Sequence, residues 1–190
     1  LGDRTRQLDG AHVEFASGIA NTIGLKCGPS LSPDALLALI DRLDPDNIPG
    51  RLVLIGRFGA DRIGECLPAL MRATRAAGRH AIWSIDPMHG NTLSAGARKT
   101  RLVRDIAEEI ALFFEVAEAE GVHAGGVHLE LTGTDVTECL GGKAALRESD
   151  LSRNYLTHCD PRLNRAQATE IAEVVARRIA GGPNAECDAA

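Results

Sequence analysis

The 190-residue sequence has few aromatic residues, no long apolar run and no excess of positive charge. Phe, Trp and Tyr together make up 3% of the chain, so an aliphatic core is expected. No apolar run approaches the about 18 residues that a membrane span needs, and no signal-like segment opens the chain. The net charge of −5 at pH 7 gives no overall attraction to nucleic acid or to an anionic membrane. Neither is therefore expected as a partner.

The sequence also lacks CxxC pairs, although it contains five cysteines. An odd number of cysteines in a chain long enough to bury a core does not indicate a disulfide framework. A reducing compartment, the cytoplasm, is therefore expected, or the plastid if the source is a plant. With 44% hydrophobic and 25% charged residues, the composition is typical of one soluble globular domain or of a part of a larger one.

Short apolar runs alternate along the chain with longer stretches of helical periodicity. The runs predict strands over residues 22–26, 52–57, 80–86 and 126–131. The periodic stretches predict helices over residues 8–20, 33–43, 61–77, 101–120 and 166–180. Because each strand is apolar throughout, parallel strands covered on both faces are expected. The predicted class is α/β with about four βα units, either a small open sheet or half of a (β/α)8 barrel.

Charged or metal-binding residues stand at the end of each predicted strand. They are Lys26, Arg57, Asp86 with His89, and Glu130 within the fourth strand. In parallel α/β folds the functional site lies at the C-terminal ends of the strands, so these side chains are predicted to converge. A single such residue is more often a solvated loop charge, but the repetition over four strands favours a common site.

Two of these residues are cations flanked by glycines. Lys26 stands before a Gly-Pro turn, and Arg57 lies between Gly56 and Gly59, which let a bound group approach the backbone. Arginine offers bidentate geometry and lysine a point charge, so the pair predicts a clamp for a phosphate or carboxylate. No P-loop or dinucleotide-binding glycine motif occurs.

The candidate metal ligands are His89, His128, Glu130 and Asp160. Of these, His89, Glu130 and Asp160 form a mixed nitrogen and oxygen set that suits Mn²⁺, Co²⁺, Fe²⁺ or Zn²⁺. A purely structural interpretation remains open, in which His89 caps a turn, Glu130 pairs with an arginine and Asp160 begins a turn.

Seven segments, taken together, are similar to one family. They are RTRQLDGAH (4–12), KCGPSLSP (26–33), RLDPDNIPGRLVLIGRFG (42–59), DPMHGNT (86–92), FFEV (113–116), GGVHLELTGTDVTECLGG (125–142) and CDPRLN (159–164). The chain resembles class II 3-deoxy-D-arabino-heptulosonate 7-phosphate (DAHP) synthases over nearly all of residues 2–180. The resemblance implies that residues 1–180 form the C-terminal half of a (β/α)8 TIM barrel, followed by a flexible tail at 181–190.

This resemblance also implies an activity and a set of site residues. The family condenses phosphoenolpyruvate with D-erythrose 4-phosphate in the first step of the shikimate pathway. The implied metal ligands are His89, Glu130 and Asp160, with a family cysteine that lies upstream of this region, and Mn²⁺ is the favoured ion. The implied phosphoenolpyruvate ligands are Asp3, Arg4, Lys26 and Arg57, where the family has Glu in place of Asp3. Lys26 and His89 are the implied catalytic residues.

The resemblance leaves three further expectations. The full-length protein is expected to be a homo-oligomer. Half a barrel leaves two sheet edges open, so the 190 residues alone are expected to be inactive. Two other functions remain possible: an aminoDAHP synthase of a secondary-metabolite pathway, or a non-catalytic barrel relic that binds anions.

Overall fold

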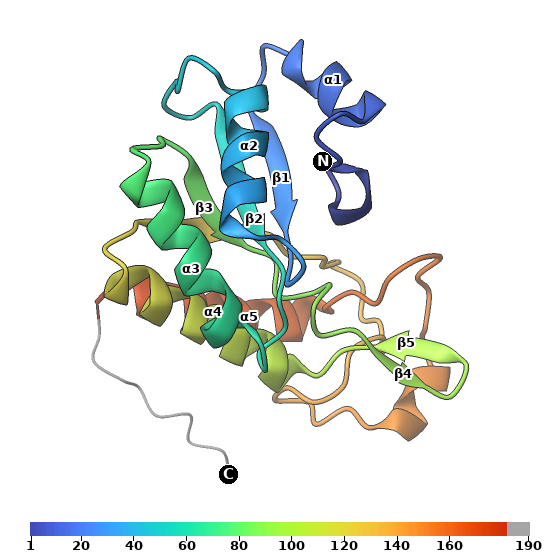
Figure 1. Cartoon of the computed structure of the whole chain (residues 1–190). Helices are drawn as coiled ribbons and strands as arrows, with labels where there is room; N and C mark the ends of the chain where they lie inside the picture. Colours follow the sequence, from blue (N-terminus) through green and yellow to red (C-terminus); the bar gives the residue numbers. More distant parts are fainter. Residues whose placement is uncertain (182–190) are drawn as a thin grey trace.

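The computed structural model describes residues 1–181 and is built on a parallel sheet of four strands (Figure 1). The strands are β1 (Ile23–Cys27), β2 (Leu52–Gly56), β3 (Ile82–Ile85) and β6 (Ala124–Val127). Their order in the sheet is β1-β2-β3-β6, and every neighbouring pair is parallel. The chain therefore adds each strand beside the previous one, as expected for consecutive βα units.

Apart from the first, which precedes β1, the helices follow strands, and all of them pack against one another in chain order (Figure 1). They are α1 (Ala11–Ser17), α2 (Pro33–Leu43), α3 (Ile63–Ala76), α4 (Val103–Ala119) and α5 (Arg165–Ile179), with two short 3-10 helices, η1 (Asp3–Thr5) and η2 (Glu148–Ser152). The predicted helix signals operate as expected. Ser32 caps α2 by accepting from Ala35 N at 3.2 Å, and α3 and α4 stop before Gly78 and Gly121, each at φ +63°.

The sheet has one buried face and one partly covered face. In β1 and β2 the alternate residues Ile23, Leu25, Leu52 and Leu54 are buried, whereas the residues between them, including Lys26, are half-buried. The expectation that both faces are covered was thus wrong for the described residues. The helices cover one face only, and no second layer of residues 1–181 closes over the other.

Two features of the chain differ from the sequence prediction. An antiparallel hairpin, β4 (Leu93–Ala95) and β5 (Arg98–Thr100), is inserted between β3 and α4. The fourth strand ends at Val127, so Glu130 lies after it and not within it. The chain leaves the sheet there because Glu130 O and Thr132 N bond instead to the backbone of Leu163.

Two expectations concern absences. Among residues 1–181, no helix has both the length and the apolar character that crossing a bilayer requires. The four described cysteines, Cys27, Cys66, Cys139 and Cys159, are free. The predicted tail lies outside the described residues apart from Gly181.

Candidate metal and anion site

Asp86 joins the ends of β1 and β3. Its carboxylate is fully buried, forms an ion pair with Lys26 Nζ, and accepts hydrogen bonds from the backbone N–H groups of Met88 at 3.0 Å and His89 at 3.2 Å. Burial alone would raise the pKa of Asp86, but hydrogen bonds from His89 and Lys26 hold it well below its usual value. Asp86 is therefore a carboxylate that links a cation at one strand end to a histidine two strands away.

The same carboxylate orients the ring of His89. Nδ1 of His89 lies 2.6 Å from Asp86 Oδ2. Because an ionised carboxylate only accepts, Nδ1 carries the proton and donates it. The lone pair of a neutral imidazole is then on Nε2, the arrangement typical of metal-binding histidines.

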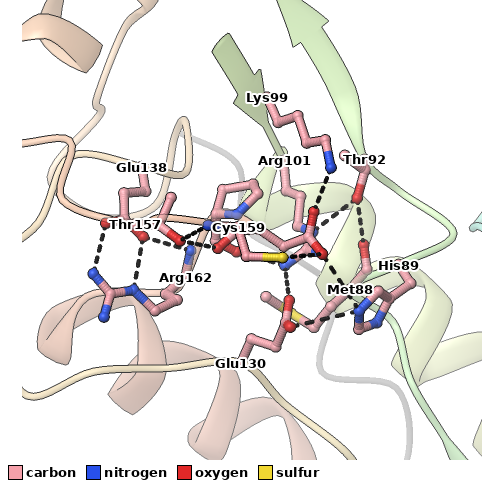
Figure 2. A network of polar contacts seen from close by, with 12 residues as sticks. Met88, His89, Thr92, Lys99, Arg101, Glu130, Glu138, Thr157, Cys159 and Arg162 are labelled. Atoms are coloured by element: carbon pink, nitrogen blue, oxygen red, sulfur yellow. Dashed lines mark hydrogen bonds and ion pairs between the residues drawn. The ribbon is translucent and has the colours of Figure 1, made fainter.

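Nε2 of His89 points toward two carboxylates from distant segments (Figure 2). It lies 3.5 Å from Glu130 Oε1 and 3.9 Å from Asp160 Oδ2. One ligand atom from each of the three residues falls within 4.8 Å of the other two. The structure thus brings together the three residues that the sequence singled out, while His128 is exposed and is not a member of the group.

Each of the two carboxylates has its other oxygen held by a cation that lies in β5 or directly after it. Glu130 Oε2 bonds to Arg101 Nη1, and Asp160 Oδ1 accepts from Lys99 Nζ at 2.8 Å. The hydrogen bond from Lys99 lowers the pKa of Asp160, against a smaller opposing effect of burial. The predicted structural alternative, an arginine partner for Glu130, is therefore also present. The arginine pair and a metal ligand role for Glu130 are compatible, because a carboxylate has two oxygens.

The donor set suits a divalent cation. One imidazole nitrogen and two carboxylate oxygens point inward, and the outward atom of each side chain is already bonded to a partner. Three protein ligands leave coordination positions for water or a substrate oxygen. No described cysteine belongs to the group, although the exposed Cys159 Sγ lies 3.7 Å from Asp160 Oδ2.

The anion side of the site is organised by Asp3. Its carboxylate bridges Arg57 Nη1 at 3.0 Å and Arg6 Nη2 at 2.6 Å, and Arg6 also reaches Ser30 Oγ at 3.2 Å. Arg4, which the sequence paired with Asp3, is exposed and forms no ion pair with any residue between 1 and 181. The reason is geometric: in a 3-10 turn residues i and i+3 eclipse, so Asp3 faces Arg6.

A buried carboxylate on α4 connects the loop of Arg57 to the loop of His89. Glu109 accepts from the N–H groups of Phe58 at 2.9 Å and Gly59 at 3.0 Å, and from Asn91 Nδ2 at 2.7 Å. Burial raises the pKa of Glu109 to about 7, against the lowering by the two backbone N–H donors. The sequence contained a signal that was missed, because Glu109 falls on the apolar stripe of its helix beside Ile106 and Ile110.

Glu138 plays a similar part for the loop that carries Asp160. Its buried carboxylate accepts from the guanidinium of Arg162 at 2.8 and 3.0 Å and from the backbone N–H of Arg162 at 2.8 Å (Figure 2). It also accepts from the backbone N–H of Leu156 at 3.1 Å. Burial raises the pKa of Glu138, but the Arg162 bonds outweigh it and lower the pKa overall. Nothing in the sequence spacing indicated this pair.

The fold and the site together define a class of protein. It is an α/β protein with a parallel sheet, and the C-terminal edge of that sheet carries a candidate anion site next to a candidate site for a divalent metal. The chain belongs to the class-II DAHP synthetase family, whose model matches residues 1–176.

Two curated bacterial relatives support this assignment. The chain is 49% identical over 180 residues to phospho-2-dehydro-3-deoxyheptonate aldolase AroG of Mycolicibacterium smegmatis, covering 94% of this chain and 39% of the relative. It is 51% identical over 177 residues to phospho-2-dehydro-3-deoxyheptonate aldolase of Streptomyces coelicolor, covering 93% of this chain and 39% of the relative. The chain therefore spans about two fifths of the length of these relatives.

Proposed function

We propose that the protein containing this chain condenses phosphoenolpyruvate with D-erythrose 4-phosphate and water to give DAHP and phosphate, the first step of the shikimate pathway. The observation that carries the proposal is the chain of contacts Lys26–Asp86–His89. It holds a candidate anion-binding lysine and a candidate metal-binding histidine on one carboxylate. A condensation of an anionic enol with an aldehyde needs such neighbouring subsites.

The proposed fold of residues 1–180 is the C-terminal half of a (β/α)8 barrel. Three features of the sheet support it: consecutive parallel strands, helices on one face, and a half-buried second face. Within residues 1–181, the only backbone bonds to the free edge of β1 come from Leu1, which donates to Gly24 O at 2.6 Å and accepts from Lys26 N at 3.0 Å. That edge and the half-buried face are where the remaining strands of a barrel would lie.

His89, Glu130 and Asp160 are proposed to hold the divalent ion, with Mn²⁺ favoured by the family resemblance over Co²⁺, Fe²⁺ and Zn²⁺. When bound, such an ion polarises a substrate carbonyl and so makes the aldehyde carbon more electrophilic. The part of this chain is to orient the His89 ring through the contact of Nδ1 with Asp86, so that Nε2 faces the site, and to present one oxygen of each carboxylate.

Phosphoenolpyruvate is proposed to bind at Lys26 and Arg57, with Asp3 orienting Arg57 and with Arg4 at the rim. Lys26 provides a charged N–H donor held by Asp86, and can carry a proton at Nζ during the reaction. Arg57 presents its guanidinium at the next strand end, where two parallel N–H groups suit a phosphate or carboxylate. Holding the enol in a fixed orientation can supply several kcal/mol of the barrier reduction.

The closest alternative is the amino-sugar version of the same condensation, and the alternative of another class is a non-catalytic relic. A relic has no need to keep three inward-facing ligands and two substrate cations in one arrangement. The complete protein is proposed to be a homo-oligomer that acts in the cytoplasm and has no nucleic acid or membrane partner. The bacterial relatives give no support to a plastid location.

The test is a steady-state assay of the complete gene product with Mn²⁺, phosphoenolpyruvate and either erythrose 4-phosphate or its imino form. We expect product from erythrose 4-phosphate and a loss of at least about 100-fold in kcat/KM for Lys26→Met. Lys143→Met, which removes an exposed lysine paired with Glu173, is the matched control and should leave kcat/KM unchanged.

Other outcomes discriminate between the alternatives. Preference for the imino substrate would identify the amino-sugar reaction, and a protein that binds Mn²⁺ but forms neither product would be a relic. Residues 1–190 expressed alone are expected to give no product, and turnover by them would contradict the half-barrel proposal.

A further inference from the structure

Arg101 is a buried cation at the junction of three segments. It directly follows β5, its side chain is fully inaccessible, and its backbone oxygen accepts from Leu140 N at 2.8 Å. Arginine is almost never fully buried unless it is paired, because removing a charge from water is costly. Its position therefore requires an explanation from its partners.

The guanidinium of Arg101 contacts every segment that carries a candidate metal ligand (Figure 2). Nε donates to Thr92 Oγ1 at 3.0 Å, and Thr92 closes the turn of His89 by donating to Met88 O at 3.3 Å. Nη1 donates both to Glu130 Oε2 and to the backbone oxygen of Pro161, the residue after Asp160.

The contact with Glu130 decides which oxygen faces the cluster. Since Oε2 is occupied by Arg101, only Oε1 is directed at His89 Nε2, 3.5 Å away. The contact with Pro161 fixes the backbone next to Asp160, whereas Lys99 holds only the Asp160 side chain and is itself exposed. Nη2 of Arg101 is buried without a hydrogen-bond partner among residues 1–181. The position of the guanidinium therefore does not satisfy all of its own donors, but it does provide hydrogen bonds to the segments of the site.

We propose that Arg101 is the positioning residue of the metal centre: it makes Glu130 a one-oxygen ligand and sets the separation of the three segments, without touching the ion. This inference rests on the proposed metal site formed by His89, Glu130 and Asp160. Partners of this kind behind metal ligands change metal affinity by about 10- to 100-fold when they are removed.

The test is the affinity of the complete gene product for Mn²⁺ alone, measured by electron paramagnetic resonance titration, with thermal unfolding of each variant recorded in parallel. Arg101→Met is expected to raise the Kd for Mn²⁺ by about 10- to 100-fold. Arg101→Lys should raise it less, because lysine keeps the charge but lacks the planar fork that reaches Thr92 and Pro161 together. Thr92→Val removes the Nε contact and the Thr92 hydrogen bond to Met88 O but leaves both Nη1 contacts, so it should have the smallest effect.

Arg104→Met is the matched control, because Arg104 lies three residues further along the chain, at the start of α4, is 81% exposed and pairs only with the neighbouring Asp105 in the described structure. Its Kd should equal that of the wild type. Should Arg101→Met not fold, Arg101→Lys and Thr92→Val decide the question.

The outcomes separate this inference from the proposed function. An unchanged Kd in folded Arg101 variants would overturn the positioning role while leaving the metal site intact. A wild-type protein that is folded but does not bind Mn²⁺ would overturn the metal site itself, and the inference with it.

Discussion

The site joins two regions that are held together differently: residues 23–127, here called the strand region, and residues 128–164, the loop region. In the strand region the buried side chains form one continuous apolar cluster across the sheet and its helices. In the loop region there is little regular structure, and Val136 and Leu151 are buried outside that cluster. Its interior is organised by buried polar side chains instead, including Glu138 and Asn164.

Each region supplies part of the site. The strand region provides Lys26 in β1, Arg57 directly after β2 and His89 in the turn after β3, so all three stand at the C-terminal edge of the sheet. The loop region provides Glu130 and Asp160, whose places follow from hydrogen bonds. Apolar packing is non-directional, whereas hydrogen bonds have defined distances and angles. An irregular segment that must keep two carboxylates near one histidine therefore depends on polar partners.

If apolar packing stabilises the strand region, the largest loss of stability is expected from a cavity made there. Phe113 of α4 is fully buried, and Phe113→Ala should lower the free energy of unfolding by about 3–5 kcal/mol. The side chain of Phe113 forms no hydrogen bond, so its removal takes away no polar partner of a site residue. The Kd for Mn²⁺ of the protein that remains folded should therefore stay unchanged. Denaturant unfolding and Mn²⁺ titration of the complete gene product measure the two quantities.

The neighbouring Phe114 provides the control. It is only half-buried and meets Phe113 edge to face, with ring centroids 5.7 Å apart. Phe114→Ala should therefore cost less stability than Phe113→Ala. A weakening of Mn²⁺ binding by Phe113→Ala equal to that from a loop-region substitution would show that the two regions are not independent.

A somewhat smaller loss of stability, but a larger effect on the metal, is expected in the loop region. Glu138→Gln replaces an acceptor oxygen by an N–H donor that faces the donors of Arg162. Removing one partner of a buried charged hydrogen bond costs about 3 kcal/mol. Since this pair holds the loop of Asp160, the Kd for Mn²⁺ should also rise, by about tenfold.

Glu148→Gln in η2 is the control for that change, because Glu148 is exposed in the same region and lies in no ion pair of the described structure. It should alter neither quantity. Calorimetry and Mn²⁺ titration give both readouts, and a Glu138→Gln protein with wild-type affinity would contradict the dependence of the metal site on buried polar partners.

Apart from the β4–β5 hairpin, the elements of the strand region could be predicted from the sequence because their signals are local and periodic. Ser32 before Pro33 marks the start of α2, and Gly78 and Gly121 mark the ends of α3 and α4. The convergence of Lys26 and Asp86 follows from the rule that parallel strands end on one edge. The shortness of β6 could not be predicted, because the apolar run continues through Leu129 and Leu131 although the backbone has left the sheet.

The loop region resisted prediction because its contacts join residues far apart in sequence. Arg101 and Glu130 are 29 residues apart, and Glu138 and Arg162 are 24 apart. No periodicity encodes such pairs, so Glu130 and Asp160 are grouped with His89 by the ligand chemistry of their side chains, and the family resemblance then implies the same set. Arg4 shows the opposite limit, since adjacency to Asp3 suggested a pair that 3-10 geometry gives to Arg6.

The smallest expected effect concerns the one buried carboxylate that the strand region places on a helix. Burial raises the pKa of Glu109 to about 7 from 4.5, with a smaller contribution from Asp86. The folded state therefore holds this proton more tightly than the unfolded state. Its stabilising contribution is fully present below about pH 4.5 and is lost as the pH rises through about 7. Glu109→Gln cannot ionise and should escape this loss.

The measurement is the free energy of unfolding of the wild type and of Glu109→Gln between pH 4.5 and 8, on the complete gene product. Between pH 5 and 7 alone the wild type should lose roughly 2 kcal/mol relative to the variant, because each unit of raised pKa is worth about 1.4 kcal/mol. Glu108→Gln, one residue away and exposed, should run parallel to the wild type. A constant difference between wild type and Glu109→Gln would mean that Phe58, Gly59 and Asn91 donate to a carboxylate that is ionised throughout. A buried ionised carboxylate would then hold backbone segments together in the strand region, as Glu138 does in the loop region.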